Sequence, residues 1–358
     1  MPAQVSPETH LHGALPASQR PRPYHQQSAR SATFDIPNLY NAKAGLYHGR
    51  YIRDYRSVLS RIEKARDLTT IRDYLSLGHR PRLYYRGENM TEFNVEGFWQ
   101  DRLSANFHLE GVGFCGLGKA FNRWMYRVRR YQFLRIVRSL DLDMSKQDVL
   151  DIGPGTGFYI DLWGHRLDAQ SVTGADITDV VIENLRNRFP QHQFHKVDIS
   201  GETIDPLAEN TFDLVSCMDV LFHIVGDDLY ANAFQNIYRL LRPGGHFIFS
   251  ENFIHSAEIR HVHHVSRSLR TIENQVTDAG FVIIRRAPMF CLMNTPVDSR
   301  SRLINGVWRR LSQLIGRSSF WGTLLGMGLY PVELLLITLL KEGPSTEIMI
   351  CMKPKETG

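Results

Sequence analysis

VLDIGPGTGFYIDLW, residues Val149 to Trp163, is the stretch that decides the fold of this chain. Its apolar start predicts a short buried strand, Gly153, Gly155 and Gly157 predict a tight turn, and the residues from Phe158 to Leu167 predict a helix. Glycines without side chains let a ligand approach the backbone, and the free N–H groups of a helix start can bind a carboxylate or phosphate. The stretch therefore predicts a site for a nucleotide-like ligand.

Strands and helices alternate downstream of this glycine loop. The predicted strands are Ser171–Ile177, Gln193–Ile199, Phe212–Val220, His246–Asn252 and Phe281–Phe290, and the predicted helices between them are Val180–Phe189, Asp227–Leu241 and Arg267–Gly280. Strands that alternate with helices indicate a mostly parallel sheet with helices on both faces.

Acidic residues at the ends of three predicted strands narrow the choice of ligand. Asp151 stands directly before the first glycine, where it would repel a pyrophosphate, so the loop favours a cationic group. Asp176 ends the second strand, where a carboxylate can accept hydrogen bonds from both hydroxyls of a ribose, as in NAD and other nucleoside ligands. Asp198 ends the third strand and could accept a hydrogen bond from an adenine amino group.

The motifs DIGPGTG, GADIT, KVDI, FDLVSCMDVLFHI and RLLRPGGHFIF follow one another between Gln147 and Phe290. Together they resemble the ordered motifs of class I S-adenosylmethionine-dependent methyltransferases. The resemblance implies a Rossmann-like α/β fold with a seven-stranded, mostly parallel sheet, and S-adenosylmethionine as the cofactor. The last strand of that sheet is antiparallel, and STEIMICMK, Ser345 to Lys353, is the candidate for it.

The resemblance also implies which residues contact the cofactor. These are Asp151, Gly153, Gly155 and Gly157 for the methionine part, Asp176 for the ribose, Ile177 and Asp198 for the adenine, and Met218 and Asp219 beside the sulfonium. A carboxylate at the loop complements the positive charge of the cofactor, while backbone amides meet its carboxylate. The alternative for each residue is a turn glycine or a helix-capping acid.

Histidines supply the candidates for a catalytic base. His223 follows the fourth predicted strand, near the expected methyl group, and an imidazole titrates close to neutral pH; packing is the alternative role. Further histidines, His255, His261, His263 and His264, follow the fifth strand in a region that lines the acceptor pocket in this fold. The spacing HVHH could bind a metal, but no carboxylate pattern accompanies it. We therefore expect no metal and histidines that face solvent or substrate.

The chain before the glycine loop divides into two parts. Residues 1–34 are rich in Pro, Ser, Gln and Arg and predict a disordered tail, whereas residues 35–140 predict a helical extension or lid. In its last helix, Lys119 to Arg138, one side could be formed by Phe121, Trp124, Val128, Tyr131 and Ile136. The basic residues of that helix indicate either a solvated face or a lid whose Arg127 or Arg130 meets an anionic substrate.

Residues 291–344 form a predicted insertion before the last strand of a core made of 141–290 and 345–354. An apolar face of Leu303, Val307, Leu311, Leu314 and Ile315 alternates with arginines in a basic amphipathic pattern. The next segment, Phe320 to Leu340, is about as long as a bilayer span. Glu333, Pro331 and three glycines interrupt it, and a span would separate the last strand from its sheet. We expect a buried cover or an interfacial lid that docks peripherally on a membrane.

Composition limits the class of protein and its expected location. The chain has 358 residues, a net charge of +5, 43% hydrophobic and 22% charged residues, as in ordinary globular proteins. The four cysteines stand far apart without a CxxC pair, so neither a zinc site nor a disulfide framework is predicted and a cytoplasmic location is expected. The oligomeric state stays open.

The predicted activity is transfer of a methyl group, by in-line displacement, to a small-molecule, lipid-linked or glycan-linked acceptor, most often at oxygen. The positive charge raises the alternative of a nucleic-acid methyltransferase, but SCMDV differs from the signatures of enzymes that methylate adenine amines or cytosine carbon. A non-enzymatic cofactor-binding scaffold is a further alternative, disfavoured because Asp151, Asp176 and Asp198 are all present. A dehydrogenase is the weakest alternative.

Overall fold

The computed structural model describes residues 94–355 of the 358-residue chain. The predicted tail, 1–34, and the first part of the predicted extension, 35–93, lie outside the described residues.

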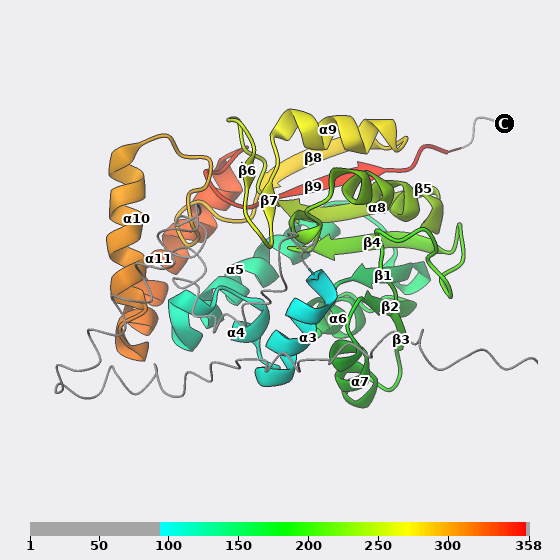
Figure 1. Cartoon of the computed structure of the whole chain (residues 1–358), viewed down its shortest axis with the longest axis horizontal. Coiled ribbons are helices and arrows are strands. Elements are labelled where there is room, and N and C mark those ends of the chain that lie inside the picture. The colour runs from blue at the N-terminus through cyan, green and yellow to red at the C-terminus, as the bar shows by residue number, and fades with distance from the viewer. Residues whose placement is uncertain (1–93, 356–358) are drawn as a thin grey trace, which may run out of the picture. The chain divides into compact units, whose positions relative to one another are not determined.

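A seven-stranded sheet forms the centre of this part of the chain, in the order β3-β2-β1-β4-β5-β9-β8 (Figure 1). The strands are β1 (Asp148–Ile152), β2 (Ser171–Asp176), β3 (Gln193–Lys196), β4 (Phe212–Met218), β5 (Leu241–Glu251), β8 (Val282–Pro288) and β9 (Glu347–Met352). β9 runs antiparallel to both β5 and β8, whereas the pairs from β3 to β5 are parallel. The predicted fold class and its antiparallel last strand are confirmed.

Alternation along the central strands divides the core into two layers. In β1, Val149 faces a cluster that includes α5 (Gly118–Arg138), α6 (Phe158–Asp161) and α7 (Asp179–Arg188). Its neighbour Leu150 faces the opposite cluster, which includes α8 (Asp227–Leu240) and α9 (Leu269–Asp278). Successive strand residues point to opposite faces, so a strand buried on both sides has the nearly continuous apolar sequence seen in β1 and β4.

The helix after the glycine loop starts and ends close to the prediction. It begins as α6 and continues as one π-helical turn, Leu162–Arg166. A small hairpin of β6 (Ile259–Arg260) and β7 (Val265–Ser266), which the sequence pattern did not predict, follows β5 and carries the HVHH residues at its turn.

Within residues 94–355, three α-helices precede the sheet: α3 (Val95–Ala105), the single turn α4 (Leu109–Val112), and α5 after a 3-10 turn. The buried face of α5 differs from the predicted one, because Tyr131 is 38% exposed. At 3.6 residues per turn, Tyr131 lies about 80° around the helix from Phe121. The buried stripe instead runs from Phe121 through Val128, Arg129 and Gln132.

The predicted insertion forms α10 (Arg302–Ile315) and α11 (Ser319–Leu339). α11 packs along α5 through small residues: a Cβ built at Gly326 would lie 2.2 Å from Cδ1 of Trp124. Glu333, in the middle of α11, is fully buried, and its carboxylate accepts hydrogen bonds from the backbone N–H groups of Cys291 and Leu292 at 2.6 and 2.7 Å. The acid that interrupts the apolar sequence therefore fastens α11 to the core.

Candidate active site

The candidate site lies at the carboxyl ends of the central strands. The order of the sheet reverses between β1 and β4, and ligands of open α/β sheets bind in the crevice outside such a switch point. The glycine loop follows β1, Asp176 ends β2, and Met218 ends β4. The topology thus brings most of the predicted residues to one edge of the sheet.

All three glycines of the loop have positive φ: +64° at Gly153, +51° at Gly155 and +80° at Gly157. Residues with a side chain rarely adopt this conformation. A Cβ at Gly153 would also lie 2.3 Å from Cγ2 of Val220, in the loop that follows β4. The glycines therefore let the two ligand-facing loops approach each other.

Asp151 has a buried carboxyl group in which one oxygen has no hydrogen-bond partner. Its Oδ1 accepts a 2.6 Å hydrogen bond from Ser216, whose hydroxyl oxygen accepts one from the indole N–H of Trp163 at 2.9 Å. Its Oδ2 is buried and has no hydrogen-bond partner. Burial raises the pKa of Asp151 to about 7, the Ser216 bond opposes this, and the charge of Asp176 adds to it. A buried acceptor without a donor is costly, so this oxygen fits the ammonium group of the predicted cofactor.

Asp176 is also buried. Its Oδ1 accepts hydrogen bonds from the backbone N–H of Thr178 at 2.9 Å and from the Thr178 hydroxyl at 2.8 Å. Burial raises its pKa to about 6, while these bonds and the backbone amides of Gly155 and Ile177 lower it. The bonds fix the carboxyl at the end of β2, next to the glycine loop, as a ribose ligand requires. Ile177 is half-buried beside it.

Asp198 is exposed. Its Oδ1 accepts hydrogen bonds from the backbone N–H and the hydroxyl of Ser200, at 2.9 and 2.6 Å. These bonds, with the one from Gly201 N–H to the Asp198 carbonyl, form a local turn and not a helix cap. The adenine contact stays a prediction.

Arg129 is a site residue that the sequence analysis missed. It extends from α5, is buried, and forms an ion pair with Asp219. Asp219 has φ +61° and is held from the other side by Ser250, whose hydroxyl lies 2.8 Å from both its backbone nitrogen and its Oδ1. The carboxylate expected beside the sulfonium is therefore shared with a guanidinium. The signal was present in the sequence, because Arg129 lies on the apolar stripe of α5.

Of the two roles that the sequence left open for Arg127 and Arg130, a solvated face or a substrate contact, the structure agrees with the solvated face. Arg127 and Arg130 are exposed, and the guanidinium of Arg127 stacks 4.0 Å from the ring centroid of Trp124. The arginine of α5 that points to the carboxyl edge is Arg129.

His223 lies in an aromatic environment formed by separate parts of the chain. Its Nδ1 is 2.8 Å from the carbonyl oxygen of His263, and the ring of Trp99, in α3, packs edge-on at 4.9 Å between centroids. A carbonyl only accepts, so Nδ1–H is the donor and Nε2 keeps its lone pair. Burial lowers the pKa of His223 to about 3, so the imidazole is neutral at pH 7.

The other loop histidines differ in how far they are buried. His263 is buried under Phe98, and burial lowers its pKa to about 4; His264 has a pKa lowered to about 3 for the same reason. His255 is half exposed and pairs with Asp298 at 2.7 Å. Within residues 94–355, no group of three or more His, Cys, Asp or Glu side chains is placed to hold a metal.

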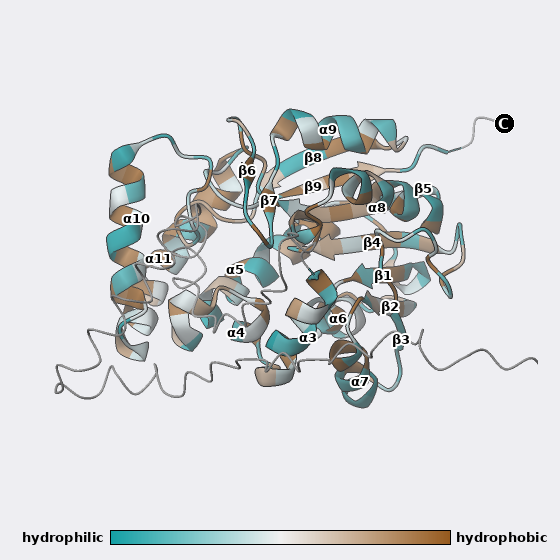
Figure 2. Ribbon diagram, viewed as in Figure 1, coloured by the Kyte–Doolittle hydropathy of each residue, from teal (hydrophilic) through white to brown (hydrophobic). Residues whose placement is uncertain are grey.

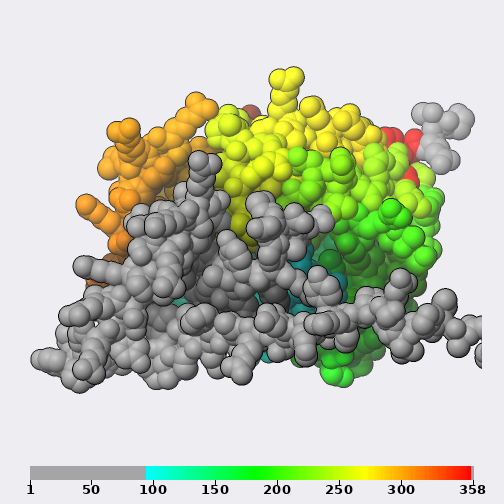
Figure 3. Space-filling model, viewed as in Figure 1, coloured from blue at the N-terminus to red at the C-terminus, as the bar shows by residue number. Residues whose placement is uncertain are grey.

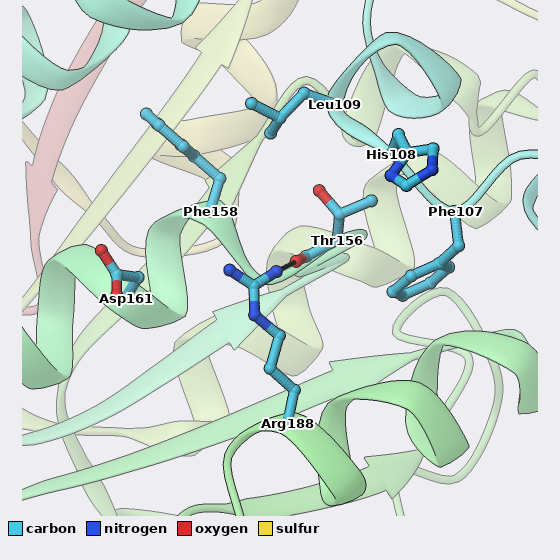
Figure 4. A pocket seen from close by; sticks show the side chains of 7 residues that line it. All are labelled: Phe107, His108, Leu109, Thr156, Phe158, Asp161 and Arg188. Carbon is cyan, nitrogen blue, oxygen red and sulfur yellow. Dashed lines mark hydrogen bonds between the residues drawn. The ribbon is translucent and has the colours of Figure 1, made fainter.

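A small cavity lies beside the glycine loop, with a volume of about 230 Å³ (Figure 4). It is lined by Phe107, His108, Leu109, Thr156, Phe158, Asp161 and Arg188. Arg188 donates a 2.8 Å hydrogen bond to the carbonyl of Thr156 across it. The cavity is below the roughly 300–1,000 Å³ of ligand pockets. Outside its lining, Val112 of α4 lies against Gly155 of the glycine loop.

Residues 150–249 match a family model described as a methyltransferase domain. The chain contains a class I methyltransferase domain. Its predicted motifs are thereby confirmed as a set, and the cofactor of the domain is S-adenosylmethionine.

Curated relatives match about a third of the chain. A malonyl-[acyl-carrier protein] O-methyltransferase of Marinomonas sp. (strain MWYL1) is 30% identical over 112 residues, 30% of this chain and 40% of the relative. A ubiquinone biosynthesis O-methyltransferase of Albidiferax ferrireducens is 32% identical over 112 residues, 30% of this chain and 42% of the relative. The chain thus spans less than half the length of these relatives.

Solved structures with a similar fold include the N-methyltransferase NodS of Bradyrhizobium japonicum WM9 in complex with S-adenosyl-L-homocysteine. It is 15% identical, with a TM-score of 0.43, over 73% of this chain and all of that one.

The raised pKa values of Asp151 and Asp176 predict how cofactor binding by the methyltransferase domain depends on pH. The ammonium and the ribose hydroxyls favour ionised carboxylates, whereas falling pH protonates these groups as it passes about 7 and about 6. We expect the affinity for S-adenosylhomocysteine to fall at least about tenfold between about pH 8 and pH 5.5. Calorimetry across that range measures it, and a flat profile would show that neither carboxyl is coupled to the ligand.

Proposed function

We propose that this protein transfers the methyl group of S-adenosylmethionine to a hydroxyl oxygen of a small or lipid-linked acceptor. The observation that carries the proposal is the buried, unpartnered Oδ2 of Asp151 beside a glycine loop that is free of side chains. The family match of residues 150–249 supports it. The relatives named for malonyl-[acyl-carrier protein] and ubiquinone biosynthesis are O-methyltransferases, which favours oxygen.

The chain's own residues then have three tasks. Asp151 and Asp176 bind the ammonium and the ribose, the backbone of the glycine loop accommodates the methionine part, and the ion pair of Asp219 with Arg129 fixes the wall beside the sulfonium. The cofactor supplies an activated methyl group, so the protein has mainly to orient the attacking oxygen.

His223 is the proposed partner of the acceptor hydroxyl. Because its Nδ1–H donates to the carbonyl of His263, Nε2 is left to accept a hydrogen bond from that hydroxyl and to take its proton as the methyl is transferred. Aromatic rings around it, Trp99 and Phe222, have centroids 4.9 and 4.5 Å away. Such walls suit an apolar or aromatic acceptor.

We infer that the segment from α3 to α4 moves when the cofactor binds. Val112 lies on Gly155, and the glutamine side chain of Gln100 accepts a 3.2 Å hydrogen bond from the backbone of Val180, so this segment lies over the ends of β1 and β2. The ion pair of Glu96 with Lys196, at 2.8 Å, is a second polar contact between this segment and the core. Movement of the segment would break both contacts.

Methyl-labelled S-adenosylmethionine tests the proposal directly. Full-length protein is incubated with a hydroxylated quinol carrying a short prenyl chain, with a malonyl thioester, and with total RNA. We expect label in the organic phase, attached to oxygen. Label that appears only in RNA would establish the nucleic-acid alternative, and absence of transfer to any acceptor by protein that binds S-adenosylhomocysteine would favour the scaffold.

A further inference from the structure

One face of α11 is apolar and open to solvent along its whole length. The exposed side chains on it are Phe320, Trp321, Leu324, Met327, Val332, Leu335 and Leu339, with exposed fractions from 37% to 69%. At 1.5 Å per residue this helix of 21 residues is about 31 Å long. Figure 2 shows the apolar character of α11 next to the mixed surface of α10. Isolated exposed leucines are ordinary in soluble proteins, but a continuous apolar face marks an interaction site.

α10 extends this surface with three further exposed apolar residues, Leu303, Ile304 and Val307. Figure 3 shows α10 at the molecular surface, in orange. Of the face predicted for this helix, Ile315 is buried, whereas Leu303 is 76% exposed. We define the docking face as these exposed residues of α10 and α11 together.

Charge along α10 and α11 is mainly positive. Arginines 300, 302, 309, 310 and 317 are all exposed. The only acidic residue between Arg300 and Lys341 is Glu333, which is buried and bonded to the backbone at Cys291 and Leu292. An apolar face bordered by arginines complements the surface of an anionic bilayer. The exposed acid beyond its end, Glu342, is held in an ion pair with Arg286.

A spanning arrangement of α11 conflicts with the fold. Within the described residues, α11 is the one helix long and apolar enough to cross a membrane, and 22% of its most apolar window is buried. However, β9 begins at Glu347, soon after α11 ends, and pairs with β5 and β8 inside the sheet. One side of α11 also packs on α5 through Gly322 and Gly326. Both flanks of α11 therefore stay on the same side of a bilayer.

We propose that the docking face binds the surface of an anionic lipid bilayer, with α11 lying in the plane of the interface. Its apolar residues enter the boundary between headgroups and acyl chains, while the arginines meet lipid phosphates. Phe320 and Trp321 stand at the start of α11, and aromatic residues are enriched at this depth. The proposal does not depend on the methyl transfer proposed above.

Docking would place the active site close to a lipid-dissolved acceptor. Trp124 of α5 packs against Tyr330 of α11, with 5.4 Å between ring centroids, and the same α5 carries Arg129 to Asp219. One helix thus contacts both the inner side of α11, which carries the docking face, and the candidate site.

Vesicle flotation of the full chain tests the proposal. We expect the protein to float with vesicles of phosphatidylglycerol and phosphatidylcholine and to bind pure phosphatidylcholine at least tenfold more weakly. The triple substitution Leu324→Gln, Met327→Gln and Leu335→Gln, at exposed positions, is expected to lower partitioning at least tenfold without changing the melting temperature. Val282→Gln and Leu229→Gln, also at exposed apolar positions but outside the docking face, are the matched controls and should bind normally.

A second pair of variants tests the charge. Arg309→Gln with Arg310→Gln should lower binding to anionic vesicles, whereas Arg166→Gln with Arg270→Gln, on other surfaces, should leave it unchanged. Protein that stays unbound with both vesicle types would overturn the proposal. So would a dimer in sedimentation velocity that the triple variant dissociates, without vesicle binding, because the face would then join two copies.

Discussion

Replacement of Asp176 by alanine is expected to weaken binding of S-adenosylhomocysteine at least about 100-fold while the fold survives. A hydrogen bond to a charged group contributes about 1.5–3 kcal/mol, and the ribose offers two hydroxyls to this carboxylate. Two such bonds correspond to a loss of about two orders of magnitude or more. The loss to the fold is small by comparison, because the carboxyl is held only by Thr178 and nearby amides and its burial already opposes ionisation.

The matched control for this variant is Asp179→Ala. Asp179 stands three residues later at the start of α7, is exposed, and pairs with Lys196 at 2.7 Å. Calorimetry should find that the Asp179→Ala variant binds S-adenosylhomocysteine with wild-type affinity. Wild-type affinity in Asp176→Ala, at an unchanged melting temperature, would remove Asp176 from the site.

Substitution of His223 is expected to have the largest effect on turnover, a fall of about 10²–10⁴-fold at saturating acceptor. Two variants separate its chemical role from a structural one. In His223→Asn the amide nitrogen can replace Nδ1–H as donor to the carbonyl of His263, which keeps the loop bond but removes Nε2. In His223→Ala both are lost.

If Nε2 accepts the proton, asparagine and alanine lose turnover alike while the affinity for S-adenosylhomocysteine stays within a few-fold of wild type. Restored turnover in His223→Asn would identify packing as the role of this histidine. Because the pKa of His223 is lowered to about 3, its protonation should leave no inflection in the rate between pH 6 and 8. His165→Gln, at an exposed histidine on the π-helical turn, is the control.

The parallel sheet and the glycine loop were predictable because local chemistry determines them. Val149 and Leu150 are apolar since both faces of β1 are covered, and Gly153, Gly155 and Gly157 have the positive φ values that only a glycine accepts without strain. The ends of the predicted strands can be located in the sequence, so the acid at each end could be placed at the carboxyl edge of the sheet. Such features need no knowledge of distant contacts.

The contacts around His223 and Asp219 could not be predicted without the tertiary structure. Trp99 reaches His223, and Arg129 reaches Asp219, from helices that precede the sheet in the sequence. No spacing rule brings such pairs together. The sequence grouped Tyr131 with the apolar side of α5 and left the roles of Arg127 and Arg130 open, because the phase of α5 depends on what it packs against: the sheet on one side and α11 on another.

Glu333 illustrates a sequence signal whose structural reason is visible only in the fold. It argued against a membrane-spanning helix because a charge interrupts the apolar run. In the fold, the same carboxylate accepts two backbone hydrogen bonds from the loop after β8 and holds α11 on the core.

Calorimetric titration of the full-length protein with S-adenosylhomocysteine, and in parallel with NAD, at about pH 8 tests whether the glycine loop and its acids bind this cofactor. We expect one binding site per chain for S-adenosylhomocysteine and no heat from NAD. When the titration is repeated toward pH 7 in buffers of different ionisation enthalpy, we expect release of protons from Asp151 and Asp176. Binding of NAD alone, or of neither ligand, would contradict this cofactor assignment.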